Sequence, residues 1–248
     1  MLEVQGLGKD YGETRAVRDL SFRVQAGEIY GLVGPNGAGK TTTLRMLSGV
    51  MPIQEGTVRI AGHDLEREER RAKRAMAWVP EDPAPFDSLT VWEHLEFTAS
   101  LYKVRPWSER AEELLEHFSL TEKREALGGE LSRGMRQKLA FCCAWLSRPR
   151  VLLLDEPLSG LDPRGIRDAK QAIRDLAADG TAVLLSSHLL DLIEELCGRI
   201  LILARGRSVF QGTLAEARSN LIGSENSTLE EIFLTITDAS ERRSEASR

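Results

Sequence analysis

The sequence contains few cysteines, and their number and spacing exclude two kinds of stabilising site. Its 248 residues include only three, Cys142, Cys143 and Cys197. An odd number without C-x-x-C spacing supports neither a disulfide framework nor a zinc site. Because Cys142 and Cys143 lie in the apolar segment 139–146, we expect them to be small core residues.

The sequence also has no long hydrophobic run. A membrane-spanning helix needs about 20 consecutive apolar residues, whereas the densest apolar stretches, 151–154 and 200–204, have the length of β-strands. The N-terminal segment MLEVQGLGKD lacks a basic region followed by an apolar core, so no secretory signal is visible. We therefore expect a soluble, cytoplasmic chain.

The sequence also has no excess of positively charged residues. There are 33 Lys and Arg residues against 38 Asp and Glu residues, which gives a net charge of −5. A protein that binds nucleic acid by neutralising phosphates normally has the opposite balance, so we expect no nucleic-acid partner. The charged run at 66–74 mixes both signs at helical spacing, which indicates a solvated helix face.

The order of apolar patterns predicts an α/β protein with a helical insertion. Short strands are expected early in the chain, at 17–24, 28–33, 58–60 and 76–79. From 89 to 146, apolar residues recur at helical spacing, which predicts an all-helical insertion. Strands and helices then alternate from 151 to 203, which predicts a parallel sheet covered on both faces.

The strongest motif is the glycine-rich segment GPNGAGKT at 34–41, which fits G-x-x-x-x-G-K-[ST]. It follows a strand-length apolar run and opens a helical pattern. Glycines let successive backbone N–H groups turn towards a phosphate, and the positive end of the helix dipole adds to the attraction. Lys40 then reaches the β- and γ-phosphates, and the Thr41 hydroxyl suits a magnesium ligand. A plain glycine turn that caps a helix is the alternative interpretation.

A second motif, VLLLDEP at 151–157, is an apolar strand that ends in two carboxylates. It delivers both acids to the carboxyl edge of a parallel sheet, where ligands of α/β proteins bind. Since side chains alternate along a strand, Asp155 and Glu156 are expected to have different roles. Asp155 suits the coordination shell of magnesium, and Glu156 suits the polarisation of an attacking water.

A third segment, LSRGMRQ at 131–137, follows two glycines and opens another helical pattern. Ser132 is expected to cap this helix, which by itself contributes about 1 kcal/mol. A helix start with free backbone donors is also a second anion site. The segment SGLD at 159–162 and His188, after the strand end LLSS, complete the order of motifs.

In this order the motifs resemble those of the ATP-binding subunits of ABC transporters, over residues 2–237. The resemblance implies a P-loop NTPase fold, with a RecA-like core, an N-terminal antiparallel β-subdomain and a helical ABC subdomain. The implied parts are a nucleotide-binding core (1–84 and 150–215), a helical signature subdomain (85–149) and a C-terminal helix with a frayed tail (216–248).

The resemblance also assigns residues to a site for ATP and Mg²⁺. It implies that Glu156, His188 and Lys40 are catalytic and that Tyr11 stacks on adenine. The ATP-binding residues that it implies are Tyr11, Gly34, Pro35, Asn36, Gly37, Ala38, Gly39, Lys40, Thr41, Thr42, Ser132 and Gly134. The implied metal ligands are Thr41, Asp155 and Glu81, and the implied dimer contacts are Ser159, Gly160, Leu161 and Asp162. Two subunits would bind ATP head to tail, so that Ser132 and Gly134 face the other subunit's phosphate loop.

Two positions depart from the family pattern. Glu81 stands where the family usually has glutamine, and an added carboxylate near magnesium would change the metal coordination or the pKa of Glu156. The signature reads LSRGM where many members have LSGGQ, and we interpret Arg133 and Arg136 as solvated helix residues. With the closing segment TLEEIFLTIT at 228–237, these departures resemble a bacterial export subgroup whose permease is a separate polypeptide.

The implied function is a motor subunit that hydrolyses ATP to ADP and phosphate and drives a membrane permease. Such a chain is expected to be cytoplasmic and peripheral on the inner face of the membrane, beside a second ATP-binding subunit. Its docking surface is expected on the helical insertion and the segment around Glu81. Phe86, Leu89 and Trp92 are candidate contacts, although core packing explains each of them equally well.

Two other functions fit parts of the pattern. A non-transport ABC ATPase, regulatory or nucleic-acid remodelling, usually carries tandem nucleotide domains, coiled-coil arms or basic linkers. This chain has one phosphate loop, no heptad run and a net negative charge. The second alternative is a P-loop kinase of small substrates. This hypothesis does not explain the segments LSRGM and SGLD or His188.

Overall fold

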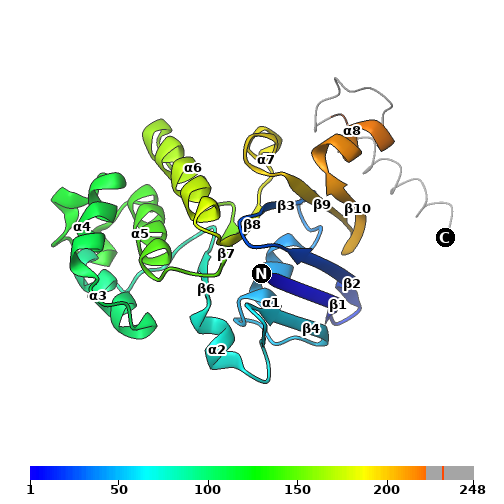
Figure 1. Ribbon diagram of the computed structural model, residues 1–248, viewed down its shortest axis with the longest axis horizontal. Helices are drawn as coiled ribbons and strands as arrows, with labels where there is room; N and C mark the ends of the chain where they lie inside the picture. The colour runs from blue at the N-terminus through cyan, green and yellow to red at the C-terminus, as the bar shows by residue number, and fades with distance from the viewer. Residues whose placement is uncertain (222–230, 232–248) are drawn as a thin grey trace.

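The computed structural model describes residues 1–221 and residue 231, which form two β-sheets and the helices around them (Figure 1). One sheet has four strands in the order β2-β1-β4-β5, and the other has six in the order β10-β9-β3-β8-β7-β6. Within the described residues, no helix is both long and apolar enough to cross a membrane. The segment 228–237, apart from residue 231, and the last ten residues, for which fraying was predicted, lie outside the described residues.

The four-stranded sheet is antiparallel. β1 (Leu2–Tyr11) pairs with β2 (Thr14–Val24) on one side and with β4 (Glu55–Ile60) on the other, and β4 pairs with the short β5 (His63–Asp64). In β2, the buried residues Leu20, Phe22 and Val24 alternate with exposed ones. This period of two is the pattern that predicted the strand.

The six-stranded sheet is parallel except at one edge. Its parallel strands are β3 (Ile29–Val33), β6 (Met76–Val79), β7 (Val151–Asp155), β8 (Ala182–Ser186) and β9 (Arg199–Ala204). The prediction of a parallel sheet over residues 151–203 is confirmed, and the edge strand β10 (Arg207–Thr213), which is antiparallel to β9, lies beyond that range and was not predicted. β10 is mostly exposed and therefore lacks the apolar run that revealed the inner strands.

Helices cover both faces of this sheet. The helices α3 (Val91–Tyr102), α4 (Ser108–His117), α5 (Arg133–Leu146), α6 (Pro163–Ala178), α7 (Leu190–Leu196) and α8 (Leu214–Leu221) contribute to one apolar core. The helices α1 (Lys40–Leu47) and α2 (Glu69–Arg74) share the other core with the antiparallel sheet. Short 3₁₀ helices at Thr121–Lys123 and Gly128–Glu130 complete the predicted helical insertion. Of α2, only Ala72 is buried, which agrees with the predicted solvated face.

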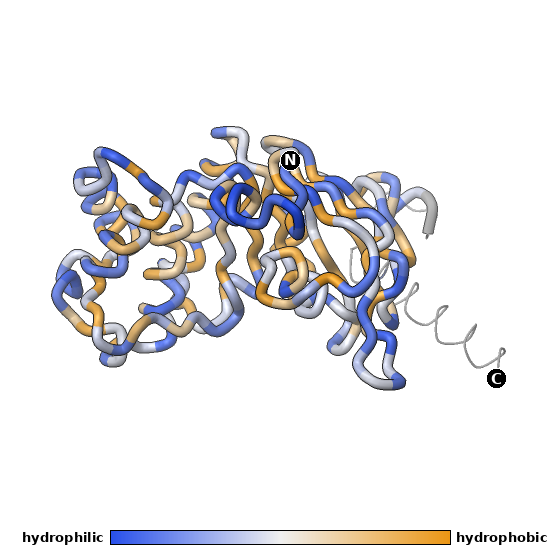
Figure 2. The backbone as a smooth tube through the Cα atoms, turned by 90° about the horizontal axis from the view of Figure 1, so that it is seen from below, coloured by the Kyte–Doolittle hydropathy of each residue, from blue (hydrophilic) through white to orange (hydrophobic). Residues whose placement is uncertain are grey.

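The central strand β7 contributes side chains to both cores. Leu152 and Leu154 belong to the core that includes α5 and α6, whereas Val151 and Leu153 belong to the core beside the antiparallel sheet. In Figure 2 the hydrophobic residues concentrate in such central strands, and hydrophilic residues in the outer loops. The prediction that this sheet is covered on both faces is therefore confirmed.

All three cysteines are free thiols. Cys142 and Cys197 are buried and Cys143 is half-buried against the core. Burial raises the pKa of the Cys143 thiol to about 11. The prediction that Cys142 and Cys143 are core residues is confirmed, since neither is held as a thiolate at neutral pH.

Candidate active site

The phosphate loop at 34–41 connects β3 to α1, as the motif predicted. Gly37 and Gly39 have positive φ angles of 77° and 106°, which residues with a side chain rarely adopt. A Cβ atom on Gly39 would lie 2.5 Å from the carbonyl oxygen of Ala16 in β2, so only glycine fits there. No side chain caps the N-terminus of α1. Its first backbone N–H groups are therefore available to an anion.

Lys40 is the first residue of α1, and its side chain turns back along the loop. It is 8% exposed, and its Nζ atom donates a hydrogen bond to the carbonyl oxygen of Gly34 at 2.6 Å. Burial lowers the pKa of the Lys40 ammonium, whereas the nearby carboxylates of Glu156, Asp155 and Glu81 act in the opposite direction. The lysine and the three acids predicted to act with it therefore share one site.

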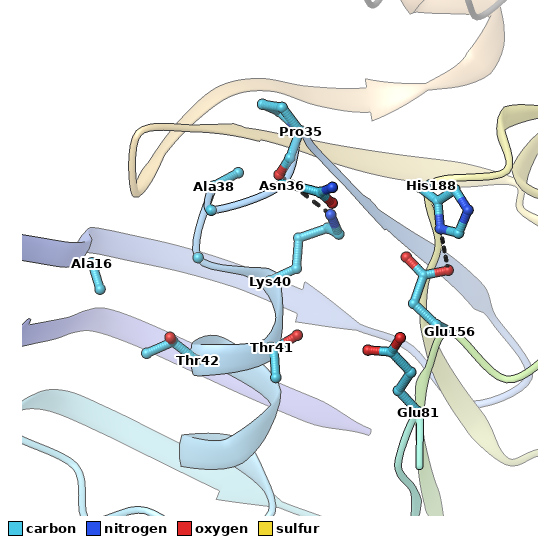
Figure 3. A pocket seen from close by; sticks show the side chains of 12 residues that line it. Ala16, Pro35, Asn36, Ala38, Lys40, Thr41, Thr42, Glu81, Glu156 and His188 are labelled. Atoms are coloured by element: carbon cyan, nitrogen blue, oxygen red, sulfur yellow. Dashed lines mark hydrogen bonds and ion pairs between the residues drawn. The ribbon is translucent and has the colours of Figure 1, made fainter. Parts of the chain in front are cut away.

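A pocket of about 390 Å³ opens over the loop (Figure 3). The loop, with Lys40 and Thr41, lies on one side, and Glu81, Glu156 and His188 lie on the other. The residues that line it are Ala16, Pro35, Asn36, Gly37, Ala38, Gly39, Lys40, Thr41, Thr42, Glu81, Glu156 and His188. The fold thus gathers residues from five separate segments around a volume suited to a polyphosphate.

The two carboxylates at the end of β7 face different surroundings. Asp155 is 2% exposed and accepts a hydrogen bond from the Ser186 hydroxyl at 2.6 Å. Glu156 has a positive φ angle of 45°, which turns the chain out of the strand and its side chain into the pocket. The two acids thus have different surroundings, and their different roles stay a prediction. Strand alternation alone did not predict the left-handed backbone of Glu156.

Glu156 is held by the segment that follows β8. Its Oε2 atom lies 2.8 Å from Nδ1 of His188 and accepts a hydrogen bond from the Ser187 hydroxyl at 3.2 Å. The side chain of Glu156 is 12% exposed and that of His188 is 63% exposed. A carboxylate fixed by two neighbours at the mouth of a pocket is oriented to accept a proton.

Of the residues predicted for the phosphate, adenine and metal of the chain's own site, three do not line the pocket. Gly34 and Asp155 lie outside its lining, although both act on Lys40, the first through a hydrogen bond and the second through its charge. Tyr11 is 46% exposed, and its hydroxyl lies 3.1 Å from the Met51 sulfur rather than in the pocket. Its stacking role stays a prediction.

The start of α5 also lies outside the lining of this pocket. Ser132 is exposed and caps the helix, because its hydroxyl accepts a hydrogen bond from the Met135 N–H at 3.3 Å. A Cβ atom on Gly134 would lie 2.7 Å from the carbonyl oxygen of Gly160. The signature residues and the 159–162 segment are thus adjacent to each other, and neither lines the pocket of its own chain.

Three side chains of α5 tie it to the segment after β7. The Arg133 guanidinium donates to the Ser159 hydroxyl at 3.0 Å, so Arg133 is not the purely solvated residue that was expected. Gln137 is fully buried, and its amide donates to the carbonyl oxygen of Pro157 at 3.0 Å. The Lys138 ammonium lies 3.2 Å from the Asp162 carboxylate. Leu161, the remaining predicted contact, packs against the core.

Sequence reasoning missed two contributors to the site. Ala16 in β2 lines the pocket, and its carbonyl approaches both Gly39 and Gly206. No sequence signal marks an alanine that meets the loop only through the packing of two sheets. Ser187 could have been predicted from the sequence. It is a hydroxyl residue beside His188 at the end of a strand, where parallel sheets bind ligands.

Comparison with known proteins identifies the family of this chain. The family described as ABC transporter matches residues 17–159. The chain is 38% identical to the daunorubicin/doxorubicin resistance ATP-binding protein DrrA of Streptomyces peucetius, over 89% of this chain and 67% of that protein. It is 39% identical to the Nod factor export ATP-binding protein I of Paraburkholderia xenovorans (strain LB400), over 90% of this chain and 73% of that protein.

A solved structure described as the ATP-binding subunit of an ABC transporter superposes with a TM-score of 0.92. Its sequence is 33% identical, and the match covers 96% of this chain and 99% of that one. The chain therefore belongs to the ABC transporter family as one of its ATP-binding subunits, and this family is one of ATPases.

Proposed function

We propose that this chain is the ATP-hydrolysing motor of an exporter whose membrane permease is a separate polypeptide. The observation that carries the proposal is the pocket in which the phosphate loop and Lys40 face the linked pair of Glu156 and His188. Two relatives named for drug resistance and for Nod factor export support the direction of transport. Both are ATP-binding proteins, so each implies a membrane partner of this kind.

Different residues of the pocket bind the phosphates, accept a proton and position the base during hydrolysis. The backbone N–H groups of the loop and Lys40 stabilise the negative charge of the phosphates. Glu156 accepts a proton from the water that attacks the γ-phosphorus, and the products are ADP and phosphate. His188, whose Nδ1 atom lies 2.8 Å from Glu156, holds the carboxylate in place.

The site suits Mg²⁺ by the chemistry of its donors. Thr41 and Glu81 line the pocket, and the charge of Asp155, which is outside its lining, acts on Lys40. These residues offer oxygen atoms, which Mg²⁺ prefers, and this ion is normally held by few protein ligands together with substrate phosphates. When bound, Mg²⁺ neutralises charge on the phosphates. Thr41, Asp155 and Glu81 are the residues that would hold it.

A second ATP-binding subunit completes the site in this proposal. Ser132 and Gly134 are at an exposed helix start outside their own pocket, where backbone donors and the helix dipole attract an anion. The ATP bound by one subunit then bridges to the signature helix of the other. The 159–162 segment, beside Gly134, lies at the same interface.

The permease docks, in this proposal, on the helical region and the segment around Glu81. Phe86 is 57% exposed and is the best of the three candidate contacts. Trp92 packs on Trp107 with ring centroids 5.0 Å apart, and the Arg124 guanidinium covers its ring at 3.5 Å, so it is a structural residue. Leu89 is half-buried. Docking places the chain on the inner face of the membrane.

The test is ATP-dependent transport in vesicles that contain the membrane protein encoded by the adjacent reading frame. Phosphate release by the purified chain measures hydrolysis, and stimulation by the membrane protein measures coupling. Hydrolysis that this protein never stimulates, with no transport, would favour the non-transport ABC ATPase instead.

A further inference from the structure

Two consecutive serines lie beside the two consecutive acids of the site. Ser186 is the last residue of β8 and Ser187 follows it, next to Asp155 and Glu156 at the end of β7. In the ladder between these strands, Asp155 is opposite Ser186, and the Glu156 N–H donates to the Ser186 carbonyl oxygen at 3.0 Å. The preceding positions of β8, 182–185, are all apolar and buried. Hydroxyl groups thus replace the apolar side chains of β8 where the strand reaches the acids.

The first serine binds the first acid. Ser186 and Asp155 are 0% and 2% exposed, and the Ser186 hydroxyl donates to Oδ1 of Asp155 at 2.6 Å. A hydrogen bond to a carboxylate is stronger than one between neutral groups, and it offsets the cost of burying the hydroxyl. Because the bond fixes the rotation of the Asp155 carboxylate, it also fixes the direction of the second carboxylate oxygen.

The second serine binds the second acid. Ser187 is 1% exposed, and its Oγ atom accepts a hydrogen bond from the Leu189 N–H at 3.0 Å. The hydroxyl hydrogen is therefore free to point to Oε2 of Glu156, which lies 3.2 Å away. The bond from Leu189 closes the backbone around His188, whose Nδ1 atom lies 2.8 Å from the same Oε2. Ser187 thus joins the carboxylate of Glu156 to the segment that carries the histidine.

The plainer explanation is that each hydroxyl only satisfies its own hydrogen-bonding needs. The other two buried serines among the described residues, Ser48 and Ser147, do so without an acid. Each donates to the backbone carbonyl oxygen three residues earlier, at 3.0 Å and 2.8 Å respectively. At the end of β8 the acceptors are instead the two side chains assigned to the metal and to the attacking water, and each serine serves one of them.

We infer that Ser186 and Ser187 are positioning residues with separate roles, in which Ser186 orients Asp155 towards the metal ion and Ser187 holds Glu156 as the base. The inference rests on the proposed function, because it explains how the two acids of that site are kept in place. A carboxylate that rotates freely presents the required oxygen for only part of the time. Loss of the Ser186 bond therefore weakens metal binding, whereas loss of the Ser187 bond slows hydrolysis.

Ser187→Ala should lower kcat for phosphate release about tenfold, the factor that a hydrogen bond to a charged group typically contributes. It should leave KM for ATP and the affinity for ADP nearly unchanged, and Ser187→Thr, which keeps the hydroxyl, should restore most of the rate. Ser186→Ala is tested without hydrolysis. We expect it to weaken the binding of Mn²⁺ to the ADP-loaded chain about tenfold, measured by electron paramagnetic resonance, because carboxylate sites accept Mn²⁺ as well as Mg²⁺. Its affinity for ADP without metal should equal that of the parent chain.

Ser147→Ala is the matched control, since it also removes a buried hydroxyl but lies outside the nucleotide pocket, and it should change neither quantity. Circular dichroism verifies that each variant is folded. A cysteine variant, which keeps the size of the side chain and weakens the donor, replaces any alanine variant that is not.

Unchanged kcat in Ser187→Ala, a Ser187→Thr protein that is equally slow, unchanged Mn²⁺ affinity in Ser186→Ala, or equal losses in Ser147→Ala would each overturn the inference. If the parent chain hydrolyses ATP while Ser187→Ala keeps its rate, only the serine assignment is wrong. A parent chain that hydrolyses no ATP contradicts the proposed function and the role of Ser187 with it, whereas the Mn²⁺ measurement still tests Ser186.

Discussion

The Nδ1 atom of His188 lies 2.8 Å from the Glu156 carboxylate, which joins the end of β7 to the segment after β8 at the mouth of the pocket. The same carboxylate accepts a hydrogen bond from Ser187, so two consecutive residues fix it. Glu156 lies opposite Lys40, so that a carboxylate is on one side of the pocket and a cation on the other (Figure 3).

Glu156→Gln should abolish most ATP turnover and leave ATP binding intact. The amide keeps the shape of the side chain but cannot take a proton from water, and such groups contribute roughly 10²–10⁴ in rate. Phosphate release and nucleotide affinity measure the two effects. Lys40→Ala is the comparison variant, because loss of its phosphate contact should weaken ATP binding about tenfold or more. Near-normal turnover in Glu156→Gln would show that another group is the base.

Glu81→Gln should be tolerated. If Glu81 takes the place of the family's glutamine, the amide still offers an oxygen ligand from the same position in the pocket. We expect ATPase activity within several-fold of the parent chain, whereas Glu81→Ala should reduce stimulation by the permease more than ATP affinity. A Glu81→Gln protein as inactive as Glu156→Gln would instead make Glu81 a catalytic carboxylate.

The assembly proposal predicts a trapped dimer. Glu156→Gln with Mg²⁺ and ATP should elute from a sizing column as a dimer, since unhydrolysed ATP bridges each phosphate loop to the other subunit's signature helix. Ser132→Arg, which places bulk and positive charge at this helix start, should prevent it. The activity of the parent chain should rise faster than linearly with protein concentration. A monomer under trapping conditions, with strictly proportional activity, would leave a different chain as the partner.

Stability of the helical region depends on the capping box that begins α3. The Thr90 hydroxyl accepts from the Glu93 N–H at 3.1 Å, and the Thr90 N–H donates to the Glu93 carboxylate at 2.7 Å. Thr90→Ala should lower the free energy of unfolding by about 1 kcal/mol, measured by urea denaturation. Glu96→Ala, at an exposed position of the same helix, should change it little. Equal effects of the two variants would argue against the cap.

Sequence patterns predicted the parts of the fold that repeat a simple period. β7 is buried on both faces and therefore reads as the continuous apolar run 151–154, and the Gly34–Thr41 motif fixed the loop between β3 and α1. β10 escaped prediction because an edge strand with exposed, mixed side chains has no such period. Arg136 was misjudged as well: it is half-buried, and its Nε atom has no hydrogen-bond partner among the described residues, whereas helical spacing alone gives no sign of this burial.

The contacts between α5 and the 157–162 segment give the proposed dimer a route for communication. Arg133, Gln137 and Lys138 hold Ser159, Pro157 and Asp162 from consecutive turns of one helix. Glu156 directly precedes this segment. A displacement of the helix start by the partner's ATP would therefore shift the base that serves the chain's own ATP. If the chain forms the proposed dimer, the rate of hydrolysis at one site would then depend on whether the other site holds ATP.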